Sequence, residues 1–332
     1  MVILCRDNFD VAVLALKHGH LNSCMQNAQQ AVEKYLKAVI VERDLEFRRT
    51  HRLPELEECA LLVRLSGDYS LLDRPEVLVG IFHPRPEYVA KEKPRNAIDV
   101  LIPVEDDIVV GGRFHLIGKS APNILFFHGN GEIVADYDEL GPLYNSMGMN
   151  FVPVDYRGYG RSSGRPTVTS MMRDCHAVFE FVKHWLGGND YTGALIVMGR
   201  SLGSASALEL ATHHKDRIDA LIVESGFAHT GPLLQLLGVS TSAIGFSEEK
   251  GFRNLEKIRT WNKPILIIHA EFDHIIPFSD GQALYNECPS SDRTFIKIPG
   301  ANHNDIFARG LDRYMKAVKS LSETLSRSTE NR

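Results

Sequence analysis

The sequence has few cysteines, and none of them forms a recognisable pair. The five cysteines of this 332-residue chain are Cys5, Cys24, Cys59, Cys175 and Cys288, and no CxxC motif occurs. An odd and scattered set argues against a disulfide framework or a zinc knuckle and favours a reducing compartment. No metal-ligand spacing is visible either. We therefore expect no metal site and no bound cofactor.

An excess of basic residues and long apolar runs are also missing. The formal net charge is −5 and the sequence pI is near 6.3, so we expect no nucleic-acid partner and no attraction to anionic membranes. No segment approaches about 18 uninterrupted apolar residues, and the N-terminus carries no basic leader. These absences predict a cytoplasmic protein without a membrane span or a signal peptide.

Two regions with different hydrophobic periodicity follow each other along the chain. In residues 1–78 apolar residues recur at helical spacing over 9–43, and a further helix is predicted over 54–66. In residues 82–325 short apolar runs rich in β-branched residues alternate with amphipathic segments. We predict a small all-α module followed by a larger α/β domain.

The α/β region reads as a mostly parallel sheet with helices on both faces, because its strands and helices alternate. Strands are predicted at 98–104, 113–117, 123–127, 151–155, 194–198, 220–224, 264–270 and 294–298. Helices are predicted at 132–147, 168–187, 202–214, 279–287 and 306–324. The pair within 98–117 should form an antiparallel edge of the sheet.

A Gly-x-Ser-x-Gly motif, Gly199-Arg-Ser201-Leu-Gly203, follows a predicted strand and opens a predicted helix. A nucleophile at such a turn is strained, and only small residues two positions before and after it avoid clashes. The N-terminus of the following helix favours a developing anion. The motif alone also arises by chance, but its strand-to-helix setting identifies Ser201 as the predicted nucleophile.

A second motif, His128-Gly-Asn130-Gly, ends the predicted strand 123–127. Glycines here let backbone amides turn toward a nucleophile. The amides of Asn130 and Leu202 are therefore the predicted oxyanion-hole donors. The ring of His128 itself is interpreted as a buried, hydrogen-bonded structural group.

Two late residues can complete a catalytic triad with Ser201. Asp273 follows the predicted strand 264–270, and His303 lies in a loop after the predicted strand 294–298, so both emerge where a parallel sheet places its binding crevice. The chain order Ser, Asp, His is that of the α/β-hydrolases. Rival residues are the acids Glu271 and Glu224 and the bases His229, His269 and His274, of which His269 is interpreted as core.

Together these segments resemble the α/β-hydrolase superfamily, in particular its small serine hydrolases with a His-Gly-Asn-Gly turn. Those families include esterase-like, acyl-protein thioesterase-like and aminopeptidase-like members. The block 155–164 also matches the loop after their fourth strand, where Arg157 and Gly158 are expected to brace the crevice. The resemblance covers about 82–325 and implies the fold, the triad and hydrolytic chemistry. In these folds a lid commonly follows the strand that ends here at Glu224, and the segment before Pro264 is short, at about 39 residues.

The first region resembles a HEPN domain. The resemblance lies in the stretch 26–38, Gln-Asn-Ala-Gln-Gln-Ala-Val-Glu-Lys-Tyr-Leu-Lys-Ala, and in Thr-His-Arg-Leu at 50–53. Many HEPN proteins are ribonucleases with an Arg and a His separated by roughly four to six residues. Arg43 and His51 are separated by seven. We therefore expect a module for protein interaction or self-association rather than a ribonuclease.

The leading functional hypothesis is a serine hydrolase that cleaves carboxylic esters or thioesters of small molecules through an acyl-enzyme. The lid, between Glu224 and Pro264, is rich in leucine and either walls the site or packs onto the sheet. An aminopeptidase or amidase of the same fold is the first alternative. The second is a non-catalytic scaffold whose helical module recruits a partner.

Overall fold

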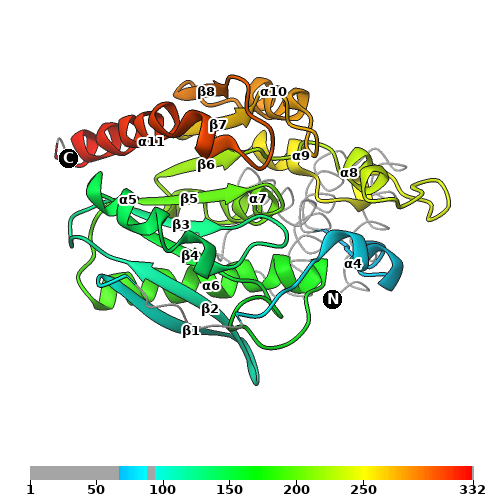
Figure 1. Ribbon diagram of the computed structural model, residues 1–332, viewed down its shortest axis with the longest axis horizontal. Coiled ribbons are helices and arrows are strands. Elements are labelled where there is room, and N and C mark those ends of the chain that lie inside the picture. Colours follow the sequence, from blue (N-terminus) through cyan, green and yellow to red (C-terminus); the bar gives the residue numbers. More distant parts are fainter. Residues whose placement is uncertain (1–66, 88–93, 331–332) are drawn as a thin grey trace, which may run out of the picture. The chain divides into compact units, whose positions relative to one another are not determined.

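The computed structural model describes residues 67–87 and 94–330, with side chains up to Leu325. Residues Gly67–Arg332 form one compact unit. The helices predicted over 9–43 and 54–66 lie outside the described residues. Figure 1 shows the described part as a twisted sheet with helices on either side.

One eight-stranded sheet runs through this unit in the order β1-β2-β4-β3-β5-β6-β7-β8. Its strands are β1 (Ala97–Glu105), β2 (Ile108–His115), β3 (Asn123–Phe127), β4 (Asn150–Val154), β5 (Leu195–Arg200), β6 (Ala220–Glu224), β7 (Ile265–Ala270) and β8 (Arg293–Ile298). β1 and β2 are antiparallel, β2 meets β4 antiparallel, and all pairs from β4 to β8 are parallel. The predicted fold class is confirmed.

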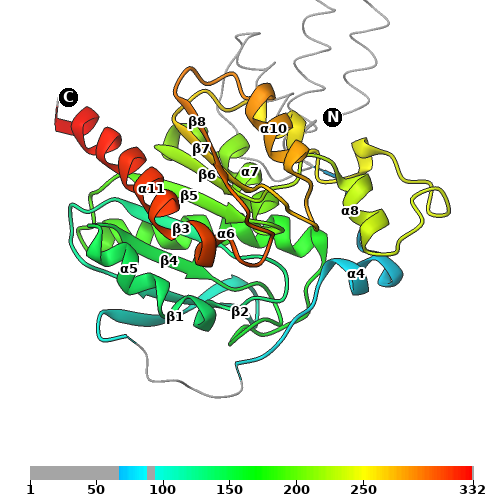
Figure 2. The ribbon, with the colours of Figure 1, turned by 45° about the horizontal axis from the view of Figure 1, so that its top comes forward.

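Helices cover both faces of the sheet, as Figure 2 shows from a second direction. The helices are α4 (Pro75–Ile81), α5 (Leu140–Ser146), α6 (Val168–Gly188), α7 (Gly203–His213), α8 (Thr230–Leu236), α9 (Asn254–Ile258), α10 (Phe278–Glu287) and α11 (Ile306–Glu330). Residues of α5 and α11 pack in one apolar core, and residues of α4, α6, α7, α9 and α10 pack in the other. Every residue of the central strands β3, β4, β5, β6 and β7 is buried. Their unbroken apolar pattern follows from helices on both sides.

Two predicted elements differ from the structure for local reasons. The helix predicted over 132–147 is divided into a 3₁₀ turn, Val134–Tyr137, and α5. Pro142 lacks an amide hydrogen and clashes with the preceding turn, so it fits only in the first turn of a new helix. The strand predicted over 113–117 begins at Ile108, because a tight turn with Asp107 at φ 61° returns the chain directly from β1.

The structure contains a short helix, α4, that the periodicity did not predict. Residues 67–82, which include this helix, pack against the sheet domain. Leu72, Val77 and Ile81 are at most 2% exposed and belong to the larger core. The Asp73 carboxylate accepts hydrogen bonds from the amides of Val168 (2.6 Å) and Thr169 at the start of α6. The domain boundary expected between 78 and 82 stays a prediction, but these residues pack with the sheet domain.

Candidate active site

The backbone at Ser201 forms a sharp turn between β5 and α7. Ser201 has φ 53°, in the left-handed region that non-glycine residues rarely adopt. A Cβ on Gly199 would lie 2.3 Å from the carbonyl oxygen of Gly203, and a Cβ on Gly203 would lie 2.1 Å from that of Phe127. Only glycine fits at either position. The structure thus gives the Gly-x-Ser-x-Gly motif the strained turn that its sequence predicts.

The structure brings Ser201, His303 and Asp273 together in one hydrogen-bonded chain. His303 Nε2 lies 2.9 Å from Ser201 Oγ, and His303 Nδ1 lies 2.8 Å from Asp273 Oδ2. A carboxylate only accepts, so Nδ1 carries the proton and Nε2 is left to accept from the serine hydroxyl. All three side chains are nearly inaccessible to solvent. The arrangement can remove a proton from Ser201.

The Asp273 carboxylate is held in its charged form. Burial alone would raise its pKa, but the hydrogen bond and charge of His303, and bonds from two backbone amides, lower the pKa below its ordinary value. Those amides belong to Ile275 and Ile276 and lie 3.0 and 2.8 Å from Oδ1. The loop after β7 therefore fixes both the charge and the orientation of this side chain.

The two rival acids are engaged elsewhere, and the rival base His269 lies 3.7 Å from Asp273 Oδ2. Glu271 pairs with Lys297 and accepts a hydrogen bond from the amide of Gly300. Glu224 accepts a hydrogen bond from Arg200. His269 is buried, as expected for a core residue, and its Nε2 contacts the carbonyl oxygen of Ile276 at 3.0 Å. Neither glutamate has a hydrogen bond to His303 within the described residues.

The two predicted oxyanion donors lie on adjacent loops. The start of α7 packs against the end of β3, because a Cβ on Gly203 would lie 2.7 Å from the carbonyl oxygen of His128. The side chain of Asn130 is fixed by the amide of His83 and the hydroxyl of Tyr159, both 2.8 Å from Oδ1. The amides of Asn130 and Leu202 have no acceptor among the described residues. Their role as donors stays a prediction.

No local sequence motif identifies His83 or Tyr159, because each reaches Asn130 from a distant part of the chain.

His128 is buried and hydrogen-bonded as expected, with Nε2 at 3.2 Å from Asp155 Oδ1. Arg157 makes paired bonds to Asp174 and a further bond to Glu105. It braces the loop after β4, the structural role expected for it.

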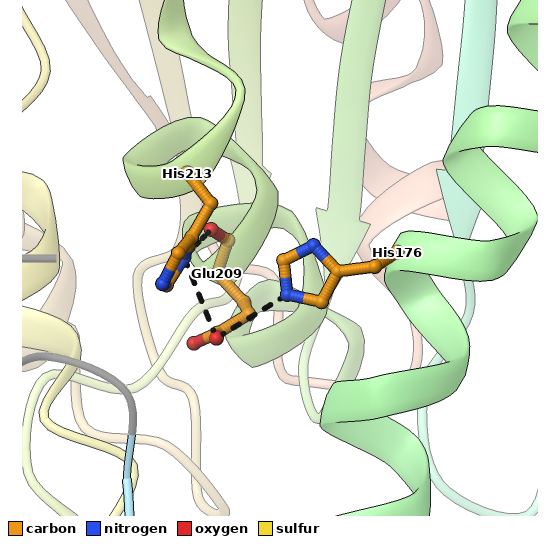
Figure 3. Close-up of side chains that lie close together, drawn as sticks. All are labelled: His176, Glu209 and His213. Atoms are coloured by element: carbon orange, nitrogen blue, oxygen red, sulfur yellow. Dashed lines mark hydrogen bonds and ion pairs between the residues drawn. The ribbon is translucent and has the colours of Figure 1, made fainter. Parts of the chain in front are cut away.

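A second cluster of titratable side chains lies between α6 and α7 (Figure 3). Candidate ligand atoms of His176, Glu209 and His213 all lie within 4.8 Å of one another. Glu209 Oε1 is 3.5 Å from both His176 Nε2 and His213 Nδ1. The buried ammonium of Lys257 contacts the other oxygen of Glu209 and balances its charge. A divalent cation would add two positive charges where the one carboxylate is already neutralised, so this cluster is an unfavourable metal site.

A groove of about 490 Å³ opens between α4 and the segment that follows α8. Its lining is mostly apolar and comprises Glu76, Val79, Gly80, His83, Leu236, Leu237, Gly238, Val239, Ser240, Ala243 and Ile244. His83 belongs both to this lining and to the contacts that fix Asn130. The groove therefore adjoins the predicted oxyanion turn.

Two family models match parts of the chain. Residues 118–244 match the model described as serine aminopeptidase, S33, and residues 5–70 match the HEPN domain. Human alpha/beta hydrolase domain-containing protein 17B is 31% identical over 215 residues, which cover 60% of this chain and 67% of the relative. The chain belongs to the α/β-hydrolase superfamily.

Other curated relatives match this α/β-hydrolase over only part of their length. Protein bem46 of Schizosaccharomyces pombe is 29% identical over 191 residues, 56% of this chain and 63% of that protein. Alpha/beta hydrolase domain-containing protein aho-3 of Caenorhabditis elegans is 30% identical over 187 residues, 55% and 52% respectively. The α/β-hydrolase thus spans between about half and two thirds of the length of these curated relatives.

Solved structures agree with the fold of this α/β-hydrolase. An esterase of Pyrococcus furiosus superposes with a TM-score of 0.60 at 17% identity, over 74% of this chain and 100% of that one. The Est1E protein of Butyrivibrio proteoclasticus, with ferulic acid bound, gives a TM-score of 0.56 at 19% identity, over 68% of this chain and 98% of that one.

In the part of the chain that the structure describes, no helix is both long and apolar enough to cross a membrane.

Proposed function

We propose that this α/β-hydrolase is a serine hydrolase that cleaves carboxylic esters or thioesters through Ser201, His303 and Asp273. The observation that carries the proposal is the unbroken hydrogen-bonded chain from Ser201 Oγ through both ring nitrogens of His303 to the Asp273 carboxylate. The positive φ of Ser201 supports it, because strain of this kind occurs where a nucleophile is presented.

In the proposed reaction, His303 Nε2 accepts the proton of Ser201 Oγ as that oxygen attacks the carbonyl carbon of the substrate. The oxyanion forms beside the amides of Asn130 and Leu202, and the imidazolium of His303 is stabilised by Asp273. Collapse expels the alcohol or thiol, which takes the proton from Nε2 and leaves an acyl-serine. Water then attacks with His303 as base and releases the acid. These steps use only side chains and amides of this chain.

The apolar groove beside Asn130 supports an acyl substrate of modest size. Its volume lies within the range of small-ligand pockets, roughly 300–1,000 Å³. Of the lid residues, Leu234 is buried in the core while Leu236 is 53% exposed at the groove. Leu234 thus packs onto the core, and the exposed Leu236 supports the proposal of an apolar wall near the site. Two solved structures with the same fold, an esterase and the Est1E protein with bound ferulic acid, are consistent with this class.

An aminopeptidase is the second candidate, and the description of the matching family model favours it. A peptide substrate would use the same nucleophile and base, with an amine as the leaving group. The groove lining contains one carboxylate, Glu76, that could meet a positively charged amino terminus. The two candidates therefore differ in the leaving group and not in the triad.

The test compares p-nitrophenyl acyl esters of increasing chain length with aminoacyl p-nitroanilides. We expect wild type to hydrolyse short or medium esters faster than anilides, and Ser201→Ala to lower kcat by at least about a thousandfold. The matched control is Ser206→Ala on α7, because the buried Ser206 hydroxyl has no hydrogen-bond partner among the described residues. That variant should keep wild-type activity.

Each outcome decides between the hypotheses. A higher rate on anilides would replace the esterase by the aminopeptidase. If wild type and Ser201→Ala are equally inert and a fluorophosphonate probe fails to label Ser201, the catalytic proposal is wrong. A non-catalytic scaffold would then be the remaining function.

We also propose that residues 1–78 act as a module for a protein partner or for self-association, and that the protein works in the cytoplasm. The match of residues 5–70 to the HEPN domain supports a helical module. The spacing of Arg43 and His51 and the net charge of −5 speak against nucleic acid as its ligand.

A further inference from the structure

Arg200, the residue before Ser201, lies at the centre of a buried network that joins separate loops. Its side chain is 8% exposed. Nε donates to Glu132 Oε1 at 2.9 Å, Nη1 donates to Glu224 Oε1 at 3.0 Å, and Nη2 donates to the carbonyl oxygen of His303 at 3.0 Å. One guanidinium thus contacts the segment after the oxyanion turn, the end of β6 and the loop that carries His303.

The carboxylates of Glu132 and Glu224, which bind Arg200, also accept hydrogen bonds from other groups. Glu132 Oε2 accepts the amide of Gly129 and the hydroxyl of Tyr137, both at 2.6 Å. Glu224 Oε2 accepts the hydroxyl of Tyr314 at 2.7 Å. Gly129 belongs to the His-Gly-Asn-Gly turn, so Glu132 ties the predicted oxyanion turn to Arg200. The network therefore contacts the turn at Ser201, the predicted oxyanion turn and the loop that carries His303. It does not contact the loop that carries Asp273.

The charges in this network are compatible with a position next to His303, the proposed general base. Burial would raise the pKa of Glu132, but Arg200 and Tyr137 hold it below its ordinary value, whereas burial raises the pKa of Glu224. The guanidinium stays charged because the two carboxylates outweigh its own burial and raise its pKa. A positive charge balanced in this way does not oppose the imidazolium that forms on His303.

We infer that Arg200 is a positioning residue for the proposed hydrolysis, which holds the backbone of His303 and the oxyanion turn in register with Ser201. The inference rests on the proposed function. The three acceptors lie around the planar fork of one guanidinium, and lysine, with a single ammonium on a flexible stem, cannot match that fork. Loss of the fork would displace His303 relative to Ser201, and small displacements of a base are costly to catalysis.

A second buried arginine offers a matched control. Arg113 on β2 is 2% exposed and binds the carboxylates of Asp99 and Asp138 at 2.6 Å each. Its partners Asp99, Asp138 and Glu87 belong neither to the triad nor to the oxyanion turn. Arg113→Lys should therefore lower stability in the same way as Arg200→Lys while leaving the active site intact.

The experiment measures kcat and KM on the best ester for wild type, Arg200→Lys, Glu132→Gln and Arg113→Lys in the full chain. Rates are expressed per site titrated to completion with a fluorophosphonate, and melting temperatures are recorded alongside. We expect Arg200→Lys to lower kcat by about 100-fold with KM within about threefold of wild type. Glu132→Gln should lower kcat by about tenfold, and Arg113→Lys should lower only the melting temperature.

A merely structural Arg200 would behave like Arg113. The inference is overturned if kcat of Arg200→Lys per titrated site lies within twofold of that of Arg113→Lys. If Arg200→Lys does not fold, a kcat of Glu132→Gln within twofold of wild type overturns it instead. Wild type without esterase activity would contradict the proposed function, which is a different result from an active wild type with unaffected variants.

Discussion

The strained backbone at Ser201 is held by bonds on both sides of the residue. Its amide donates to the carbonyl oxygen of Glu224 at 2.9 Å, and its own carbonyl oxygen accepts the hydroxyl of Ser204 at 2.6 Å. A left-handed conformation of a non-glycine residue costs roughly 1–3 kcal/mol, so it persists only where surrounding contacts determine it. At this scale the motif and the structure agree, because Gly199 and Gly203 leave room for the turn and the carbonyl oxygen of Glu224 holds it.

The identity of the acid is tested at the residue scale by Asp273→Asn. We expect kcat on the best ester to fall by about 10⁴-fold, because an amide neither fixes the Nδ1–H tautomer of His303 nor stabilises its imidazolium. The matched control is Glu271→Gln, which removes the rival carboxylate and should keep kcat within about threefold. A large loss in Glu271→Gln with little loss in Asp273→Asn would transfer the role to Glu271.

At the scale of elements, β2 and α5 enclose a histidine that the site does not use. His115 is 1% exposed, and neither ring nitrogen has a hydrogen-bond partner among the described residues. α5 packs closely on it, because a Cβ on Gly141 would lie 2.2 Å from its Nδ1. Burial lowers the pKa of His115 to about 4, so the imidazole is neutral in the folded protein at neutral pH.

This buried imidazole predicts a loss of stability in acid. Between pH 6.5 and about 4 the unfolded chain binds a proton at His115 that the folded chain does not, so the free energy of unfolding falls as pH falls through that window. At about 1.4 kcal/mol per pH unit, the loss from this group is ~3 kcal/mol. Urea unfolding at pH 7 and pH 4.5 measures it.

The comparison of variants isolates His115 from the other titrating groups. His115→Leu should reduce the difference in unfolding free energy between the two pH values by ~3 kcal/mol, whereas His184→Leu at an exposed position of α6 should leave it unchanged. An unchanged pH dependence in His115→Leu would mean that the folded protein accommodates the proton. Other acid-sensitive groups would then dominate.

At the scale of the whole molecule, residues 69–81 decide where the chain can be divided. Leu72, Val77 and Ile81 lie in the larger core, and Asp73 accepts the first amides of α6. Removing these residues opens the core and leaves buried apolar surface exposed, and each large buried side chain contributes several kcal/mol. The HEPN match ends at residue 70.

We therefore expect a chain that starts at Gly67 to fold and to keep kcat/KM on esters within about threefold of the full chain. A chain that starts at Phe82 should lose cooperative thermal unfolding. Light scattering of the full chain and of the chain from Gly67 then tests self-association, which should depend on the removed residues. A folded, active chain from Phe82 would show that α4 is dispensable and would support the boundary at 78–82.

The sequence by itself determined the fold class and the strained turn at Ser201, because both depend on local patterns. Strand–helix alternation specifies a covered parallel sheet, and Gly199, Ser201 and Gly203 encode their turn within five residues. The sequence also proposed Asp273 and His303, since residues after parallel strands meet at one edge of the sheet. It favoured Asp273 over the rival acids Glu271 and Glu224, but only the structure shows which side chain reaches His303.

Tertiary structure alone decided which groups meet. It placed Asp273 against His303 and engaged Glu271 and Glu224 elsewhere. It also made Arg200 the centre of a network whose partner His303 lies 103 positions away along the chain. The contacts of a long, flexible side chain depend on the packing of the elements around it, and no local pattern of residues specifies that packing.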